Sequence, residues 1–109
     1  MGQINMDKLT KMDFDHMLLE WDEEKERLNF SKHGIHFRTA AKIFRDPNLM
    51  IREDQEHPHE KRFDVLGKVE KVLFVVCTLR HANTIRLISA RLATIWETEQ
   101  YENGENEFE

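Results

Sequence analysis

VLFVVCTLRHANTIRLISAR, residues 72–91, is the one long stretch of this chain that is apolar, rich in β-branched residues and free of acids. Six of the seven residues from Val72 to Thr78 are apolar, which predicts a strand buried on both faces. The short polar segment 81–84 predicts a turn into a second strand over residues 85–90. The stretch therefore predicts a central β-hairpin.

The charge of the chain is unevenly distributed. The formal net charge is −5, yet six of the 21 acids follow Arg91 and no base does, so residues 1–96 are nearly neutral. From Lys71 to Trp96 there are four cations and no acid. A basic central segment in an acidic chain indicates an anionic partner.

Length and composition indicate a single soluble domain. The chain has 109 residues, 34% of them charged and 39% hydrophobic, enough for one modest core. No apolar run approaches the roughly 20 residues that a membrane span needs, so we expect no membrane contact. The single cysteine, Cys77, lies in the most apolar strand, which favours a packed thiol in the reducing cytoplasm.

Two helices are predicted before the hairpin. Asp22 is a suitable N-cap and Gly34 a suitable C-terminal residue for the first helix, of which Leu28 is the clearest apolar anchor. The second helix has an apolar stripe at i, i+3, i+4 and i+7 and ends before Pro47, although His36 is a poor N-cap. The stripe consists of Phe37, Ala40, Ala41 and Phe44.

Further strands and a last helix complete the prediction. Residues 18–21 read as an edge strand, 49–52 and 62–66 as strands, 54–60 as a polar loop and 67–71 as a turn. Thr94 and Glu97 form a capping box for a helix over residues 95–101, before Gly104. The order β-α-α-β-β-β-β-α predicts an α+β fold with helices packed on an antiparallel sheet. The domain spans 18–103, after an N-terminal extension, 1–17, that is either frayed or vector-derived, and before an acidic tail, 104–109.

Several short motifs follow one another in a recognisable order. They are EWDEEK at 20–25, KHGIHF at 32–37, AA at 40–41, F-x-D-P at 44–47, E-x-R-F at 60–63, VVCTLR at 75–80, IRLISAR at 85–91 and A-T-x-x-E-x-x-x-Y at 93–101. Together they resemble the BrnT family, the toxin half of bacterial type II toxin–antitoxin pairs. The resemblance implies a RelE-like fold without a cofactor and a ribonuclease that cleaves mRNA and inhibits translation. It also implies neutralisation by a ribbon-helix-helix antitoxin, BrnA. Promoter DNA would be bound only by the complex, through the antitoxin.

The chemistry of RNA cleavage without a metal gives the candidate residues their roles. The 2′-hydroxyl attacks the neighbouring phosphorus, which requires a base, an acid and cations for the phosphorane. Arginine suits the last role, because its fork binds two phosphate oxygens and stays protonated. The candidates on strands are Arg62, Arg80, Arg86 and Arg91. If Arg80 pairs with Ile85, then Arg80 and Arg86 point to opposite faces; a shift by one residue brings them to the same face.

His33 and Glu60 are the candidates for proton transfer, and Lys32 and Arg86 for RNA binding. His33 lies at a helix C-terminus, where the dipole favours the imidazolium needed by a general acid. Glu60 borders the strand that carries Arg62 and is a candidate base.

Each of these residues also has a structural interpretation. His33 is equally well explained as part of a helix end, and Glu60 and Arg62 as an ion pair. Arg86, inside an apolar strand, is better explained as a structural ion-pair partner. His57 and His59 lack a third metal ligand, so we expect a solvated loop and no metal. Trp96 and Tyr101 are candidates for base stacking, but more commonly such aromatics pack on the sheet. The nuclease hypothesis requires the guanidinium groups to converge on one exposed patch without each being bound to a carboxylate.

The last helix departs from the family pattern, because it carries Ile95 and Trp96 with Glu97 and Glu99 in place of the usual cations. Fewer cations weaken the grip on a phosphate backbone. An alternative is therefore a catalytically weak or inactive homologue that binds the antitoxin and helps it to repress the promoter, with Ile95 and Trp96 in the interface. A domain that binds RNA without cutting it is a third.

Overall fold

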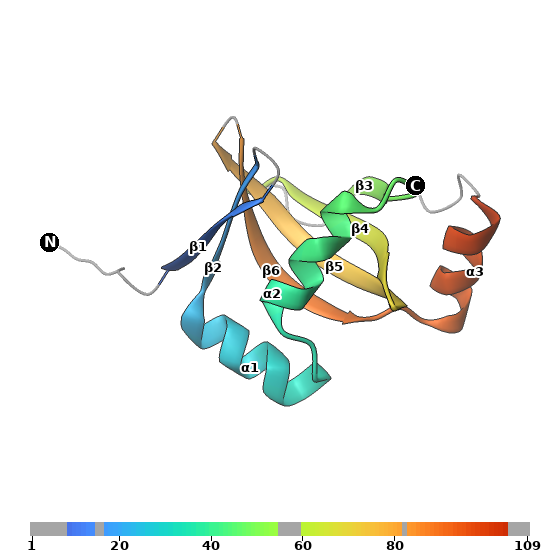
Figure 1. Ribbon diagram of the computed structural model, residues 1–109, viewed down its shortest axis with the longest axis horizontal. Coiled ribbons are helices and arrows are strands. Elements are labelled where there is room, and N and C mark those ends of the chain that lie inside the picture. The colour runs from blue at the N-terminus through green and yellow to red at the C-terminus, as the bar shows by residue number, and fades with distance from the viewer. Residues whose placement is uncertain (1–8, 15–16, 55–59, 82, 105–109) are drawn as a thin grey trace, which may run out of the picture.

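The computed structural model describes residues 9–14, 17–54, 60–81 and 83–104. In these ranges the chain forms a six-stranded sheet in the order β1-β2-β6-β5-β4-β3 (Figure 1). The helix α2 crosses one face of the sheet, and α3 lies at the opposite end of the molecule from α1 (Figure 1). The strands are β1 (Leu9–Phe14), β2 (Met17–Asp22), β3 (Met50–Asp54), β4 (Arg62–Val69), β5 (Lys71–His81) and β6 (Thr84–Leu92). The helices are α1 (Glu23–His33), α2 (Phe37–Ala40), the 3-10 helix η2 (Ala41–Arg45) and α3 (Ile95–Asn103).

The predicted hairpin is the centre of the sheet. β5 pairs antiparallel with β4 on one side and with β6 on the other. Its alternate residues Leu73, Val75 and Cys77 are buried beneath α2 and η2, where they pack with Phe37 and Ile43. Because partners in a ladder point to the same face, the other face of β5 carries Phe74, Val76 and Thr78.

The first helix has the predicted caps but a different anchor. The Asp22 carboxylate accepts a hydrogen bond from the Lys25 backbone N–H, and Gly34 adopts the left-handed conformation with φ 73°. Leu28, however, is half exposed, and Asn29 is buried instead. The Leu28 prediction was wrong because the helix is held by a polar contact: the Asn29 side chain binds the backbone of Ala90 in β6.

The second predicted helix is present but divided, because α2 continues as the 3-10 helix η2 and ends at Arg45, before Pro47. His36 makes no side-chain cap. Glu26 of α1 replaces it, since its carboxylate accepts a hydrogen bond from the Phe37 N–H at 2.8 Å. A contact between two helices thus provides the cap that the local sequence lacks.

The predicted turn over residues 67–71 was wrong for Gly67. It lies within β4 and not in a turn; the chain reverses at Glu70, which has φ 65°. A Cβ at position 67 would lie 2.6 Å from the Cβ of Ile43. Glycine here permits the close approach of η2 to the sheet.

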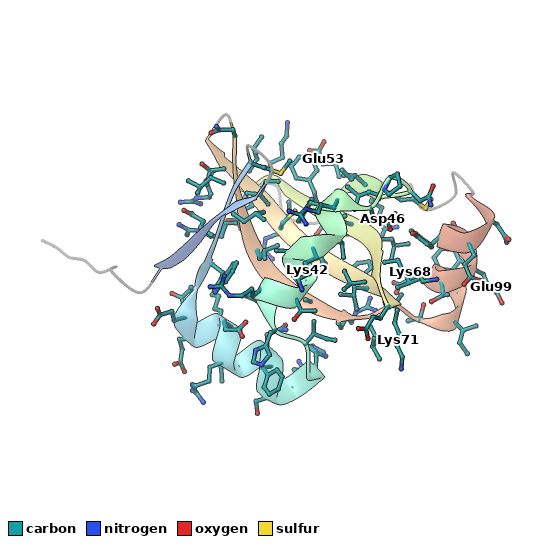
Figure 2. All side chains as sticks on the ribbon, viewed as in Figure 1. Lys42, Asp46, Glu53, Lys68, Lys71 and Glu99 are labelled. Atoms are coloured by element: carbon teal, nitrogen blue, oxygen red, sulfur yellow. The ribbon has the colours of Figure 1, made fainter. Side chains whose placement is uncertain are left out.

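The capping box of α3 is confirmed, because the Thr94 side chain accepts from the Glu97 N–H and the Glu97 carboxylate accepts from the Thr94 N–H. Tyr101 is buried against the sheet, and its hydroxyl donates to Asp46. Asp46 also accepts from the Lys68 N–H at 2.7 Å, and Figure 2 labels both residues near α3. Burial of the Tyr101 hydroxyl and its hydrogen bond to Asp46 raise the pKa of Tyr101 to about 12.

The α+β class is confirmed, with differences at the N-terminal side of the sheet. Residues 9–14, which were assigned no element, form β1 and pair antiparallel with β2. β2 is therefore an interior strand and not the predicted edge. It also pairs in parallel with β6, so the sheet is not wholly antiparallel. The pairing of β2 with β6 leaves no local signal, because it joins segments more than 60 residues apart. The pairing of β1 with β2 is local, but the polar, weakly patterned residues 9–14 gave no strand signal.

Candidate functional site

One face of the sheet carries arginine side chains from β3, β4 and β6, the last two separated by β5. Arg62 of β4 pairs with Thr78 of β5, which pairs with Arg86 of β6. In the same way Arg52 pairs with Asp64, and Arg91 with Phe74. We call the face that carries Arg52, Arg62, Arg86 and Arg91 the arginine face; it is opposite to the face covered by α2 and η2.

The register also settles the position of Arg80. Leu79, not Arg80, pairs with Ile85, and His81 pairs with Thr84, so Arg80 is the extra residue of a β-bulge. Bulges redirect side chains and are common beside active sites. The Arg80 guanidinium reaches to 4.0 Å from the Glu60 carboxylate, which also binds Arg62. Arg80 therefore joins the arginine face at one end.

Three of the arginines are bound to buried carboxylates. Arg86 donates to Glu20 at 2.8 Å across the parallel strand pair, and Arg52 donates to Asp64 at 3.0 Å. Arg91 makes two hydrogen bonds to Glu97 and stacks on the Phe74 ring at 4.1 Å. Burial acts against ionisation of Glu97, but the Arg91 and Thr94 hydrogen bonds hold its pKa below the ordinary value. These pairs hold strands and α3 together.

Glu60 differs because it is an exposed carboxylate shared by two arginines. Its side chain is 37% exposed, its Oε1 accepts from the Arg62 Nε at 2.8 Å, and Arg80 lies at 4.0 Å. The Arg62 hydrogen bond, with the charges of Arg62, Arg80 and Lys25, lowers the pKa of Glu60. We call Glu60, Arg62 and Arg80 the Glu60 cluster.

The Glu60 cluster has the components that phosphoryl chemistry requires. Glu60 is an ionised acceptor next to two permanent cations, and Arg62 uses its Nε for Glu60 while a guanidinium offers five N–H donors. A carboxylate beside two guanidinium groups is chemically suited to a phosphate contact. The nuclease requirement is not met as stated, because each of the four candidate arginines is bound to a carboxylate: Arg62 and Arg80 to Glu60, Arg86 to Glu20 and Arg91 to Glu97. Among these described pairs Glu60 differs, because its side chain is 37% exposed and the other two carboxylates are buried.

Lys32 and His33 lie elsewhere, at the C-terminal end of α1. They line a groove between α1 and β6 together with Lys25, Leu28, Ile88 and Ser89. Among the described residues, no hydrogen bond or ion pair joins His33 to Glu60. The structure thus brings together Glu60, Arg62 and Arg80, and separates from them Arg86, Arg91 and the pair Lys32–His33.

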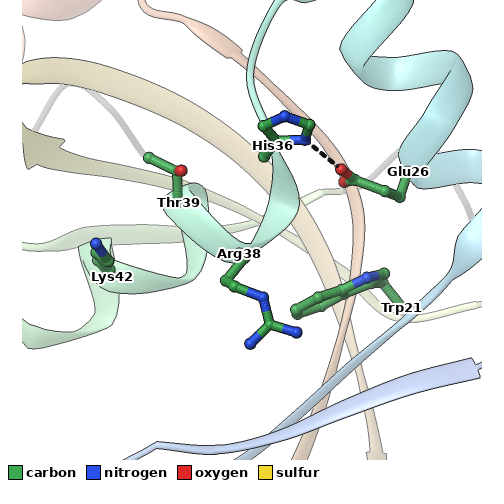
Figure 3. Close-up of a pocket in the computed structure, with 6 residues that line it drawn as sticks. All are labelled: Trp21, Glu26, His36, Arg38, Thr39 and Lys42. Carbon is green, nitrogen blue, oxygen red and sulfur yellow. Dashed lines mark hydrogen bonds and ion pairs between the residues drawn. The ribbon is translucent and has the colours of Figure 1, made fainter.

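A second hollow lies on the helical side of the molecule and has a structural explanation. Figure 3 shows His36 bound to Glu26, and Arg38 beside the Trp21 ring. The His36 Nδ1 lies 2.6 Å from Glu26, and the Arg38 guanidinium carbon lies 5.6 Å from the Trp21 ring centre. These contacts connect α1, β2 and α2, and no residue of the Glu60 cluster takes part.

Sequence analysis missed the residues that neutralise the arginine face. Glu20 lies 66 residues from Arg86, and its parallel pairing leaves no local signal. Glu97 was recognised only as part of a capping box, although its exposure of 9% marks it as a buried acid. Lys25, the third cation near Glu60, lies in the quoted EWDEEK motif and was read only as a helix residue.

Other chemistry finds little support in the described residues. They hold no group of three or more His, Cys, Asp or Glu side chains that could bind a metal ion, and His57 and His59 lie outside them. Burial raises the pKa of the Cys77 thiol to about 12, so it is no nucleophile at neutral pH. No helix in the described part of the chain has both the length and the hydropathy of a membrane span.

Comparison with known proteins supplies the family. The family model for the "ribonuclease toxin, BrnT, of type II toxin–antitoxin system" matches residues 21–97, more than half of the chain. No curated protein matches. The crystal structure of the Brucella abortus ribonuclease toxin BrnT is similar in fold, with a TM-score of 0.56 and 22% identity over 68% of this chain and 92% of that one. This chain therefore belongs to the BrnT family of ribonuclease toxins of type II toxin–antitoxin systems.

Proposed function

We propose that this protein is an endoribonuclease that cleaves mRNA without a metal ion, inhibits translation, and uses the Glu60 cluster as its active site. The observation that carries the proposal is the exposed Glu60 carboxylate held between Arg62 and Arg80. The described ion pairs of Arg52, Arg86 and Arg91 are different. Their carboxylate side chains are at most 12% exposed. If one of these arginines left its carboxylate to bind a substrate, a buried charge would remain without a partner. Glu60 is more exposed, so its carboxylate can change partners in solvent.

The proposed reaction uses the phosphate of one internucleotide link. Arg62 and Arg80 bind its two non-bridging oxygens and stabilise the negative charge of the phosphorane. Glu60 takes the proton of the 2′-hydroxyl as its oxygen bonds to phosphorus. The bond from phosphorus to O5′ then breaks, and O5′ takes a proton from a water molecule, which in turn receives the proton held by Glu60, so that the carboxylate is restored. The products are a 2′,3′-cyclic phosphate and a 5′-hydroxyl.

His33 has a binding role in this proposal and not a role in proton transfer. It lies eight residues after Lys25 on α1, about 12 Å along the helix axis. In the described part of the chain His33 lines the groove between α1 and β6 and makes no hydrogen bond or ion pair with Glu60, Arg62 or Arg80, so we assign it to the binding of the strand. Arg86 and Arg91 have structural roles, through Glu20 and Glu97.

A cleavage assay tests the proposal. Purified protein without antitoxin is incubated with single-stranded RNA in EDTA, beside an Arg62→Ala/Arg80→Ala variant and an Arg45→Ala control. Arg45 is exposed on η2, on the helical side of the sheet. We expect fragments with cyclic phosphate ends from the parent and the control, and a loss of about 100-fold in the double variant. An inert parent, or a double variant as active as the parent, would contradict the proposal.

The proposed partner is a BrnA-like ribbon-helix-helix antitoxin that neutralises the toxin in the cytoplasm and carries it to promoter DNA. Membership of a family of toxin–antitoxin pairs supports it. Expression together with the neighbouring reading frame tests the pairing: we expect one complex on gel filtration and no RNA cleavage by it. A neighbouring product that neither binds nor inhibits would rule that partner out.

A second function, an inactive homologue that represses the promoter with its antitoxin, is favoured by a different observation. Ile95 and Trp96 at the start of α3 are 81% and 54% exposed, as in an uncovered protein interface. The cleavage assay separates the two functions, because the inactive homologue would leave RNA intact while still forming the complex.

A further inference from the structure

The groove between α1 and β6 opens on the arginine face. Ser89 lines this groove and pairs with Val76 of β5. Thr78, two residues further along β5, points to the same face and pairs with Arg86. The groove has a volume of about 230 Å³. We call it the α1–β6 groove; its lining includes Lys25, Leu28, Lys32, His33, Ile88 and Ser89.

A bulge in β6 brings two consecutive residues into this groove. Val76 pairs with Ser89 and Cys77 with Leu87, so Ile88 is the extra residue. Without the bulge, Ile88 and Ser89 would point to opposite faces of the strand. With it, an apolar side chain and a hydroxyl both line the groove.

The two walls of the groove are fixed to each other. Asn29 of α1 donates to the Ala90 carbonyl at 2.9 Å and accepts from the Ala90 N–H at 3.1 Å. It also donates to the Ile35 carbonyl at 3.1 Å. The groove is therefore a preformed feature that a ligand does not need to assemble.

The lining combines cations with apolar surface. Lys25 and Lys32 lie seven residues apart on α1, about 10 Å along its axis, so they address two different phosphates. Between them Leu28 is 52% exposed, next to Ile88. Phosphates flanking an apolar base face are the chemistry of a single-stranded nucleic acid. The groove and the Glu60 cluster share the arginine face, because Ser89 pairs with Val76 and, two residues along β5, Thr78 pairs with Arg62.

We propose that the α1–β6 groove is a subsite for the nucleotides next to the scissile link, with phosphates on Lys25 and Lys32 and a base against Leu28 and Ile88. This inference rests on the proposed function, since it takes the ligand to be the RNA strand held at Glu60. The RNA then runs from the Glu60 cluster past Lys25 along α1 to Lys32 and His33.

Binding of an uncleavable strand tests the subsite apart from catalysis. The probe is a fluorescein-labelled hexanucleotide with 2′-O-methyl groups, titrated by anisotropy with the full chain at 25–200 mM salt. The test variant is Lys25→Gln/Lys32→Gln. The matched control is Lys42→Gln/Lys71→Gln, which removes the same charge at two exposed lysines outside the groove, both labelled in Figure 2. A third variant, Leu28→Ser, changes only the apolar contact.

We expect the test variant to bind about tenfold more weakly at 100 mM salt, and the slope of log K against log salt to decrease by about 1.4, for two lost phosphate contacts. Leu28→Ser should weaken binding without changing that slope. Equal slopes for test, control and parent would overturn the inference. A second result would also overturn it: a test variant that binds the hexanucleotide as the parent does but has lost affinity for an acidic peptide. The groove would then be a binding site for a protein segment.

The outcomes separate this inference from the proposed function. A parent that binds the hexanucleotide through the two lysines but cuts no RNA in EDTA overturns the nuclease and supports an RNA-binding groove. A parent that cuts RNA while the lysine variant binds the hexanucleotide normally supports the nuclease and overturns the subsite.

Discussion

Arg91 holds Glu97 through two hydrogen bonds, from its two terminal nitrogens, at 3.0 and 3.1 Å. This pair connects β6 to the first turn of α3, and Glu97 in turn accepts from the Thr94 N–H. This two-bond contact between a guanidinium and a carboxylate therefore anchors α3 to the sheet. The catalytic role of Arg91 stays a prediction, and its described contacts to Glu97 and Phe74 favour a structural role.

We expect Arg91→Met to lower the free energy of unfolding by about 1–3 kcal/mol, because Glu97 would remain buried without its partner. Thermal melting measures the change. Cleavage by the folded fraction should stay near that of the parent. The double variant Arg91→Met/Glu97→Met should recover part of the stability, since it removes the orphaned charge. A variant that keeps its stability but loses cleavage would show that Arg91 is catalytic after all.

Arg86→Met should be more damaging, because Glu20 is only 5% exposed and sits in the interior strand β2. Removing one partner of a buried pair costs about 3 kcal/mol. Urea denaturation of Arg86→Met and of Arg86→Met/Glu20→Gln measures the difference, and the double variant should be the more stable of the two. If the single variant unfolds at the same urea concentration as the parent, then Arg86 is not a structural residue and its RNA-binding role returns.

Local sequence predicted the helix caps and the central hairpin, which depend on local interactions, but not the equally local pairing of β1 with β2. The caps at Asp22, Gly34 and Thr94 act within a few residues, and the structure confirms all three. The hairpin was also predicted, because its two strands adjoin in the sequence. The parallel pairing of β2 with β6 was not, because it joins segments more than 60 residues apart.

The site was predictable in its components but not in its arrangement. The E-x-R-F motif identified Glu60 and Arg62, and the structure places them together with Arg80. Alternation alone could not place Arg80, because its position depends on a bulge. Nor could it show which arginines are neutralised, because Glu20 and Glu97 come from elements before and after the hairpin.

Asn29 should be a stability residue of α1, in place of the predicted anchor Leu28. Asn29→Ala removes three hydrogen bonds and leaves both backbone groups of Ala90 without their side-chain partner. We expect a loss of about 1–3 kcal/mol and faster hydrogen exchange at the Ala90 amide. Asn103→Ala, at the exposed end of α3, is the control and should change neither quantity. Equal stability of the two variants would contradict the role of Asn29.

The pH dependence of cleavage should report on Glu60. Its pKa is lowered by the Arg62 hydrogen bond and by the nearby cations, so the base stays ionised to below the ordinary glutamate value of 4.5. In the parent, kcat/KM should therefore be constant from pH 7 to about 5 and fall only below the ordinary value. Arg62→Ala removes the largest cause of the lowered pKa of Glu60, so the residual activity of that variant should fall at a higher pH than the activity of the parent. Circular dichroism at each pH separates this effect from acid unfolding, and Arg45→Ala should follow the parent. An acid limb that stays in place in Arg62→Ala would mean that a group other than Glu60 accepts the proton, because among the described residues Glu60 is the carboxylate that binds the deleted guanidinium.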